Sequence, residues 1–240
     1  MENTKIPLRT WFAAIYILTK NKKGMSSVSL ADELGIRQAT AWFLEHRIRF
    51  MLEEKEPVKL TNEVQIDETY VGGKRRNMHG RKRQEIKEKY GTTGSAEKLP
   101  VFGMLQSDGK LVTMPTSKND GDTLKPLIRK YVDSTATIIT DQHGAYAGMD
   151  KEYSHVIVNH GRGNYVAESG HHNNSIESAW AILKRGYVGI YHYMSPKHLH
   201  RYCHEFSYRF NTRKITSMER FKDVMLRTEC RLKYKDLIAA

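Results

Sequence analysis

The chain has few cysteines, no long apolar run and fewer acidic than basic residues. Its two cysteines, Cys203 and Cys230, argue against a disulfide framework, and the sequence has no CxxC pair for a structural zinc site. No apolar segment has the length of a membrane span and no signal-peptide pattern is present, so we expect a cytoplasmic protein without a membrane partner. The 240 residues, of which 39% are hydrophobic, can still fill one good-sized core and a small accessory domain.

The shortage of acids leaves a strong positive charge. The sequence has 39 Lys and Arg against 27 Asp and Glu, which gives a formal charge of +12. A field of this sign attracts phosphate backbones and favours a nucleic-acid partner. The cations concentrate between residues 74 and 89, where we expect a mobile basic arm, with a solvated loop that makes no DNA contact as the alternative. The residues of this arm that we expect to bind DNA are Lys74, Arg75, Arg76, Arg81, Lys82 and Arg83.

Three acidic residues occupy positions typical of a metal site on a sheet. Asp67 lies in an alternating strand pattern at residues 64–69, and Asp141 ends a β-branched run that begins at Ala136. Glu177 follows 36 positions after Asp141 in an amphipathic helix pattern. Displacement at a phosphodiester by two metals needs hard cations about 3.5 to 4 Å apart, and carboxylates are their natural ligands. Each acid alone would more often be a surface or turn residue, but together they predict a nuclease or polynucleotidyl transferase with two Mg²⁺ or Mn²⁺ ions.

Short β-branched runs and helical stripes together predict a mixed α/β layer fold. Turn residues at Ser107, Asp108 and Gly109 indicate a hairpin between two of the strands. We expect strands at residues 64–69, 100–106, 110–115, 136–141 and 155–158, and helices at residues 122–131, 144–149 and 175–184.

The residues around the three acids resemble a known family. They are Asp67-Glu68-Thr69-Tyr70-Val71-Gly72-Gly73-Lys74, then Thr140-Asp141 with Gly144 and Tyr146, then His171-His172-Asn173-Asn174-Ser175-Ile176-Glu177 with Trp180 and Leu183-Lys184-Arg185. This set is similar to the DDE transposases of bacterial insertion sequences, in the ISXO2-like branch related to Merlin elements, and the similarity runs from about Lys5 to Lys214. It implies a ribonuclease-H-like mixed sheet flanked by helices, with Asp67 on the first strand, Asp141 on the fourth and Glu177 on the helix after the sheet.

The resemblance also implies a reaction and its partners. A DDE transposase cleaves DNA at the ends of its insertion sequence with divalent metal ions and transfers the 3'-OH to target DNA. Asp67, Asp141 and Glu177 would hold the two ions. The chain would act on double-stranded DNA in the nucleoid, and we expect a homodimer or higher oligomer on DNA, because two ends must be held together.

The third catalytic position has two candidates, because members of this branch carry either Glu or Asn there. Asn174 lies three residues before Glu177 on the same expected helix face. We favour Glu177, since a carboxylate binds Mg²⁺ better than a neutral amide, and Asn174 then serves as the helix cap or as a nearby donor. Lys184, seven residues after Glu177, and Arg185 are expected to contact the DNA backbone near the cut.

Residues 1–58 are expected to form a separate domain that resembles a helix-turn-helix. A helical stripe at residues 8–19 is followed by a helix, a turn at Gly35 and a second helix at residues 37–52. A plain helical packing domain is the alternative. The residues expected to contact base edges or phosphates begin the second helix and are Arg37, Gln38 and Thr40.

The rest of the chain divides into a catalytic domain at residues 59–214 and a helical tail at residues 215–240. A basic helix late in the catalytic domain is expected to pack against the core or to contact phosphate. Its candidate DNA-binding residues are Lys197, His198 and Arg201.

Three other functions are compatible with parts of the pattern. Full-length relatives usually carry a zinc ribbon before the segment that matches Ile6, and its absence favours an inactive or domesticated remnant that only binds DNA. The intact acidic set argues against a remnant, because carboxylates beside DNA phosphates repel them. A ribonuclease H that cuts RNA would share the fold. A histidine metal site is weaker, because the histidines show no tight paired spacing of four ligands; its candidates are His155, His160, His171 and His172.

Overall fold

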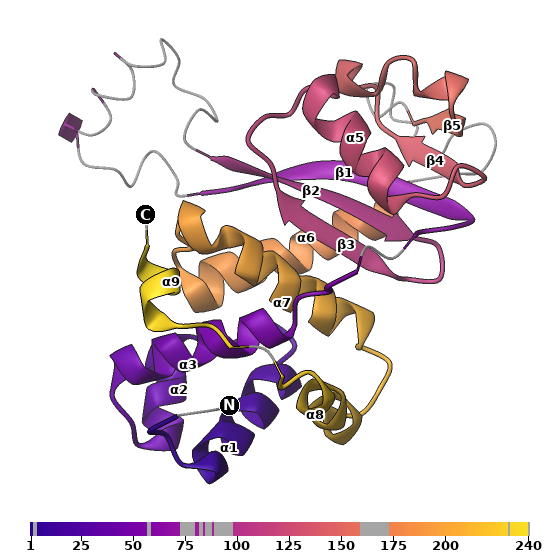
Figure 1. The fold of residues 1–240 in the computed structure, drawn as a ribbon. Coiled ribbons are helices and arrows are strands. Elements are labelled where there is room, and N and C mark those ends of the chain that lie inside the picture. The colour runs from indigo at the N-terminus through magenta and orange to yellow at the C-terminus, as the bar shows by residue number, and fades with distance from the viewer. Residues whose placement is uncertain are drawn as a thin grey trace.

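The chain folds around a mixed sheet with helices on both faces, as Figure 1 shows. The computed structural model describes residues 1, 4–56, 59–72, 80, 81, 84, 88, 98–158, 173–229 and 231–239. Within these residues the sheet has five strands in the order β3-β2-β1-β4-β5. They are β1 (Glu63–Val71), β2 (Leu99–Gln106), β3 (Leu111–Pro115), β4 (Thr137–Thr140) and β5 (Ser154–Ile157).

The strand directions identify the fold. β1, β2 and β3 form an antiparallel meander, and β4 and β5 continue the sheet parallel to β1. A three-stranded meander extended by two parallel strands in this order is the ribonuclease-H-like arrangement, so the predicted fold class is confirmed. The predicted strand positions also agree with the observed strands to within two residues at each end.

An alternating pattern of side chains makes β1 a central strand with two different faces. Val64 and Ile66 are fully buried in the cluster that also holds residues of helix α5 (Gly121–Tyr131). Gln65 and Asp67 alternate with them and therefore face the opposite side of the sheet. The strand thus carries an acidic residue to the middle of the sheet, on the side away from α5.

The connection from β4 to β5 differs from the predicted short helix at residues 144–149. The chain forms two separate 3₁₀ turns instead, η2 (Gly144–Tyr146) and η3 (Met149–Lys151). Gly148 between them has a φ of 83°, a left-handed conformation that interrupts the helical path. Tyr146 nevertheless buries its ring in the cluster beneath α5.

Helices α6 (Asn174–Gly186) and α7 (Leu199–Asn211) cover the second face of the sheet (Figure 1). Trp180 of α6 and Phe206 of α7 belong to one buried cluster with side chains of β1 and β2. The two helices are connected through η5 (Tyr187–Tyr191), a π-helix, and η6 (Pro196–His198), a 3₁₀ turn.

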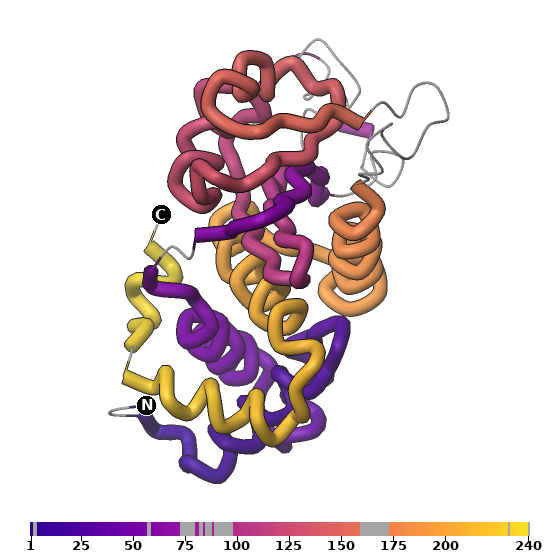
Figure 2. Tube along the Cα trace, turned by 90° about the vertical axis from the view of Figure 1, so that its right-hand side faces the viewer, coloured from indigo at the N-terminus to yellow at the C-terminus, as the bar shows by residue number. Residues whose placement is uncertain are grey.

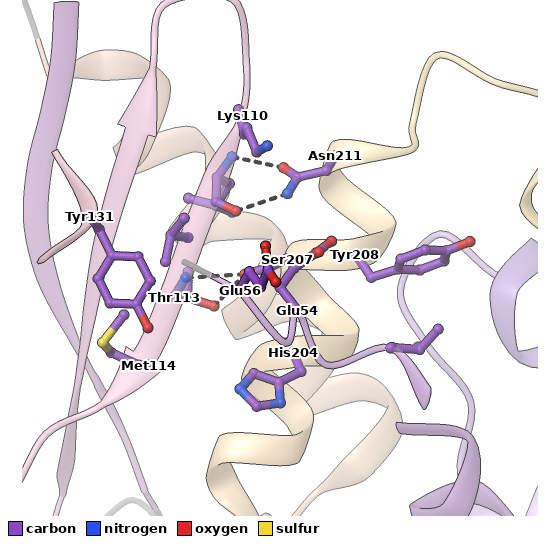
Figure 3. A pocket seen from close by; sticks show the side chains of 13 residues that line it. Glu54, Glu56, Lys110, Thr113, Met114, Tyr131, His204, Ser207, Tyr208 and Asn211 are labelled. Atoms are coloured by element: carbon purple, nitrogen blue, oxygen red, sulfur yellow. Dashed lines mark hydrogen bonds between the residues drawn. The ribbon is translucent and has the colours of Figure 1, made fainter. Parts of the chain in front are cut away.

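Side chains of α7 cover the open edge of β3 (Figure 3). Asn211 accepts a hydrogen bond from the Leu111 N–H at 2.7 Å and donates one to the Leu111 carbonyl at 2.9 Å. Ser207 Oγ accepts another from the Thr113 N–H at 3.1 Å. An edge strand exposes unpaired backbone groups, and these contacts satisfy them as a neighbouring strand would. None of the predicted catalytic acids lines the hollow of about 90 Å³ beside these contacts.

The N-terminal helices lie beyond α7, on its side away from the sheet (Figures 1 and 2). They are α1 (Leu8–Lys20), α2 (Ser27–Leu34) and α3 (Gln38–Met51). Helix α8 (Ser217–Leu226) belongs to the same core, where Val224 has 0% exposure. Part of the predicted C-terminal tail therefore completes the core of the N-terminal helices, while the domain boundaries themselves stay a prediction.

The described chain ends with a short helix, α9 (Tyr234–Ile238). The Tyr234 ring packs edge-to-face on Phe43 of α3, with ring centroids 5.3 Å apart. No helix in the described part of the chain combines the length and apolar character of a membrane span.

Candidate active site

Asp67 and Asp141 lie side by side at neighbouring parallel strands. The register of β1 and β4 pairs Gln65 with Ile139, and Asp67 and Asp141 each follow two residues later. Neighbouring strands are about 4.8 Å apart, and residues two apart on a strand share a face of the sheet. Asp67 therefore leaves the sheet on the side that α6 covers, and Asp141 follows directly after the neighbouring strand end.

The first turn of α6 brings Glu177 to the same place. The Ile176 N–H donates to Gln65 Oε1 at 3.0 Å, which anchors the N-terminus of α6 over β1. Burial raises the pKa of Asp67 to about 6, and the negative charges of Asp141 and Glu177 add to that rise. The three predicted catalytic acids are therefore within electrostatic reach of one another.

The Trp180 indole orients the Asp67 carboxylate. Its N–H donates to Asp67 Oδ2 at 3.0 Å. Gly103 on β2 is the register partner of Asp67 and leaves room for the indole ring. A methyl group at Gly103 would overlap that ring, so the close approach of α6 to the sheet requires glycine here.

Asp141 begins a tight turn after β4. Its Oδ1 accepts a hydrogen bond from the His143 N–H at 3.0 Å, which fixes the carboxylate at the start of the turn. The turn borders a hollow of about 280 Å³ that His155 also lines. His155 Nε2 lies 2.8 Å from Thr140 Oγ1, and burial lowers the pKa of this histidine. Asp141 thus stands at the edge of a cavity that can admit a substrate group.

Glu68 and Tyr146 form a contact that the sequence analysis missed. The Tyr146 hydroxyl donates a hydrogen bond to Glu68 Oε1, which ties η2 to β1. Burial raises the pKa of Glu68 to about 7, although the Tyr146 hydrogen bond opposes the rise and the charges of Asp67 and Asp141 add to it. The alternation of β1 in the sequence could have indicated this contact. Glu68 lies two residues after Ile66 and therefore faces the same core side, where a carboxyl group needs a hydrogen-bond partner.

The acidic set suits a hard divalent cation in its chemistry. Carboxylate oxygens are the ligands that Mg²⁺ prefers, and one or two of them with substrate phosphates and water can complete its coordination. The raised pKa of Asp67 reflects burial together with like charges at close range, an arrangement that a cation stabilises. Within the described residues, no three His, Cys, Asp or Glu side chains are close enough to hold one ion by themselves. The residues present therefore fit ions that also take ligands from substrate and solvent.

The predicted phosphate-contacting residues of α6 are at the surface. Lys184 and Arg185 are exposed near the end of the helix. Lys184 lies two turns beyond Glu177 on nearly the same side, because seven residues make almost two full turns. Asn174 is the exposed first residue of α6. We predicted Asn174 as the N-cap, but Asn173 occupies that position.

The turn η6 and the basic helix α7 that follows it face the N-terminal helices. Lys197 is exposed, and the half-buried Arg201 places its guanidinium 5.5 Å from the ring centre of Phe50. His198 is only 8% exposed and packs on the His46 ring at 4.7 Å. We expected this region either to pack against the core or to contact phosphate. The surroundings of His198 favour packing. Of the six arm residues predicted to bind DNA, Arg81 is described and exposed; Lys74, Arg75, Arg76, Lys82 and Arg83 lie outside the described residues.

The second helix of the predicted helix-turn-helix exposes only its beginning. α2 and α3 are connected through Gly35, whose φ of 61° makes the expected turn. Residues 44–49 of α3 are all buried, whereas Arg37 and Gln38 are exposed and Thr40 is half-buried. Helix-turn-helix proteins contact bases with the N-terminal residues of their second helix. The predicted contact with DNA therefore requires the start of α3, which is exposed.

Comparisons with known proteins agree with the predicted family. A model of the ISXO2-like transposase domain matches residues 59–211, which contain the sheet, α6 and α7. Among solved structures, a chain of the simian T-cell lymphotropic virus intasome in complex with PP2A regulatory subunit B56 gamma is similar at a TM-score of 0.32 and 11% identity. That alignment covers 94% of this chain and 75% of the other, and a likeness of this size carries no argument about the site. No curated protein matches the chain significantly.

Proposed function

Because the chain belongs to the family of ISXO2-like transposase domains, we propose that it cuts DNA at the ends of an insertion sequence and joins the 3'-OH to target DNA. The observation that carries this proposal is the placement of Asp67, Asp141 and Glu177 near one another, at the ends of neighbouring strands and the start of α6. Asp67 and Asp141 follow the same register pair of β1 and β4, and the charge of Glu177 acts on Asp67. Such a set matches the ligand chemistry of a two-metal phosphodiester site.

Each acid has a defined role in this proposal. Asp67 and Asp141 would hold one Mg²⁺ or Mn²⁺ ion, and Glu177 would help to hold a second. When bound, the two ions would stabilise charge on the attacking and leaving oxygens of an in-line displacement. The Trp180 N–H keeps one oxygen of Asp67 in place, and the bond from Ile176 to Gln65 keeps Glu177 over the strand. The protein thereby positions its carboxylates before substrate arrives.

The basic residues of α6 position the substrate. Lys184 is exposed on nearly the same side of the helix as Glu177, so it contacts a phosphate next to the cut. The net charge of +12 supports attraction of double-stranded DNA along the rest of the surface. Two DNA ends must be held together for joining, which supports a homodimer or higher oligomer on DNA.

Glu177 is the preferred third ligand over Asn174. Both are exposed in the first turn of α6, but only Glu177 contributes charge to Asp67. A carboxylate at the N-terminus of a helix is also stabilised by the helix dipole. We therefore assign Asn174 a supporting position beside the metal ligands.

Metal-dependent nicking and strand transfer on labelled DNA with the element's own ends test the proposal. Asp67→Asn, Asp141→Asn and Glu177→Gln should lose joining to background, while Asn174→Ala should retain it. Asp122→Asn removes an exposed acid on α5, across the sheet, and serves as the matched control that keeps activity.

Three results would contradict parts of this proposal. Loss of joining in Asn174→Ala but not in Glu177→Gln would move the third role to Asn174. DNA binding by the unmodified protein without cleavage in Mg²⁺ or Mn²⁺ would indicate a DNA-binding remnant. Preferential cutting of the RNA strand of an RNA–DNA hybrid would indicate a ribonuclease H.

A further inference from the structure

A groove of about 420 Å³ lies apart from the acidic residues, between the α1–α2 loop and helices α6, α7 and α8. We propose that this cationic groove binds a single strand of DNA, with phosphates on its charged rim and one unpaired base on its apolar floor. The proposal rests on the function proposed above, because it concerns a DNA strand that also passes the acidic site. The groove is lined by Lys22, Lys23, Arg185, Arg209, Arg213 and Arg220, together with three apolar side chains.

The charge of the cationic groove has one sign. Lys22, Lys23, Arg185 and Arg213 are all exposed along it, and none of the described residues that line it is acidic. Lys22, Lys23 and Arg185 form no salt bridge with a carboxylate in the described part of the chain. Phosphate groups provide the complementary charge, and each neutralised phosphate releases counterions.

Arg220 adds a buried positive charge to the same groove. It is 7% exposed and donates to the carbonyls of Thr212 and Thr19, both at 3.0 Å, and of Ile215 at 3.4 Å. These partners satisfy its N–H groups but carry no formal charge, and no described carboxylate forms a salt bridge with it. Arg209 differs, because Glu205 offsets its charge at 2.5 Å. The positive electrostatic potential in the groove therefore comes from a buried arginine held in place by hydrogen bonds, as well as from exposed lysines.

The floor of the cationic groove is apolar and aromatic. Ile182, Phe206 and Phe210 form it, and the Arg213 guanidinium lies 4.1 Å from the centre of the Phe210 ring. A duplex backbone needs no such floor, whereas an unpaired base stacks on aromatic rings and on guanidinium planes. The combination of cations and stacking surfaces is the one used by proteins that bind single strands.

Two close approaches fix the α1–α2 loop in place. A methyl group at Gly24, where φ is 90°, would overlap Tyr191 and Arg209. A methyl group at Gly186 would meet the Lys23 carbonyl at 3.0 Å. Glycine at both positions lets the loop backbone contact α6 and η5 directly. Lys22 and Lys23 therefore project from a fixed backbone.

Helix α6 connects the cationic groove to the acidic site. Glu177 is in its first turn and Arg185 is eight residues later, which is about 12 Å along the axis. Lys184 lies on nearly the same side as Glu177, while Arg185 and Ile182 turn toward the groove. A strand that leaves the acidic site past Lys184 reaches the groove at Arg185.

The test compares strand binding by variants of the full chain in EDTA, so that cleavage plays no part. The groove variant is Lys22→Ala/Lys23→Ala/Arg185→Ala, and the matched control Lys130→Ala/Lys151→Ala/Lys235→Ala removes three exposed cations elsewhere. Fluorescence anisotropy follows a labelled single strand, a duplex of the same sequence and a single strand with abasic positions. Thermal melts by circular dichroism check that all variants fold.

We expect the groove variant to bind the single strand at least about 10-fold more weakly than the control at the same salt concentration. The slope of log K against log salt should fall by about 2, at roughly 0.7 per lost phosphate contact. The abasic strand should bind the unmodified protein about 5-fold or more weakly than the normal strand, because stacking is lost, and the groove variant should not distinguish the two.

Three outcomes would overturn the groove proposal. Equal weakening by the groove variant and its control would show that only net charge matters. Equal weakening of duplex, abasic and normal strands would show a backbone site without a base. Displacement of the strand by polyglutamate at equal charge concentration would point to an acidic protein segment instead. The proposed function fails separately, because metal-dependent joining tests it, whereas strand binding in EDTA tests the cationic groove.

Discussion

The molecule treats buried charge in opposite ways in two regions, the acidic site over β1 and the interface between α3 and α7. In the interface, Glu205 accepts hydrogen bonds from Arg49 at 2.7 Å, Arg209 at 2.5 Å and Tyr191 at 2.8 Å. Burial alone would raise the pKa of Glu205, but the charges of Arg209 and Arg49 bring it below its ordinary value. Among the described residues, Arg49, Glu205 and Arg209 each have a partner of opposite sign.

The acidic site has the reverse pattern. No described Lys, Arg or His forms a salt bridge to Asp67 or Asp141, and the Trp180 N–H is a neutral donor. The charges near Asp67 have its own sign, so its pKa rises to about 6. Paired charges join two helices, whereas like charges without a cationic partner beside a strand are an arrangement that an external cation would stabilise.

Glu205→Gln should strongly destabilise the protein. The substitution leaves Arg49 and Arg209 buried without their shared carboxylate, which costs about 3 to 5 kcal/mol for a broken buried pair. Urea denaturation at pH 7 measures the free energy of unfolding. The matched control is Glu152→Gln, which breaks an exposed pair with Arg129 and should change the free energy of unfolding far less, because solvent screens the pair. Similar losses in both variants would contradict the structural role of the interface.

Gly103→Ala should destabilise the protein by about 1 to 3 kcal/mol, as overpacking of a close contact does. The added methyl group overlaps the Trp180 ring and forces α6 away from the sheet. Strand transfer should fall with it, because Glu177 is carried on that helix. Gly189→Ala is the control, since no described atom lies within 4 Å of the added group. Unchanged stability and joining in Gly103→Ala would contradict the close approach.

Acid should weaken the interface between α3 and α7. Burial lowers the pKa of His46 to about 2, so below about pH 6.5 the unfolded chain binds a proton that the folded chain does not. Burial raises the pKa of Glu45 to about 7, so between about pH 7 and 4.5 the folded chain binds a proton first, which offsets His46. Below pH 4.5 Glu45 is protonated in both states and no longer offsets His46. Glu205, with its lowered pKa, then adds to the loss of free energy of unfolding.

The free energy of unfolding should therefore change little between pH 6.5 and 4.5 from these groups, and then fall by at least about 1.4 kcal/mol per pH unit. His46→Leu should flatten this acid limb, because leucine takes up no proton when the chain unfolds. The substitution breaks no hydrogen bond, since neither ring nitrogen of His46 has a partner among the described residues. Urea denaturation at half-unit pH steps gives the slope. An unchanged acid limb in His46→Leu would show that this histidine does not resist protonation.

Trp180→Phe should lower Mn²⁺ affinity about 10-fold. Loss of a group that orients a metal ligand has effects of this size or larger. The ring still fills the space beside Gly103, but its N–H no longer holds Asp67. Isothermal titration calorimetry with Mn²⁺ measures the change. Trp42→Phe in α3 makes the same chemical change in the other region and should leave Mn²⁺ affinity unaltered. Equal effects would mean that the indole acts only through stability.

Local patterns in the sequence predicted the strands well. The alternation of Val64 and Ile66 with Asp67 sets the faces of β1, and the β-branched run before Asp141 ends where the strand ends. The convergence of Asp67, Asp141 and Glu177 was expected from the family resemblance. The structure adds the register that brings the first two together.

Features that depend on distant segments could not be predicted. Arg49 and Glu205 are 156 residues apart, and nothing in either helix identifies its partner. Gly103 looks like a weak point in a strand until the Trp180 ring is known to lie on it. Val224 likewise joins the N-terminal core from the far end of the chain. Each is set by tertiary packing, which sequence periodicity does not encode.

Anomalous scattering from Mn²⁺-soaked crystals would show whether Asp67, Asp141 and Glu177 form a divalent-metal site. We expect anomalous peaks within coordination distance of the Asp67 and Asp141 carboxylates, and none there in crystals of Asp67→Asn soaked in the same way. Mn²⁺ bound elsewhere, with no peak at Asp67 or Asp141 in well-ordered crystals of the unmodified protein, would contradict this expectation.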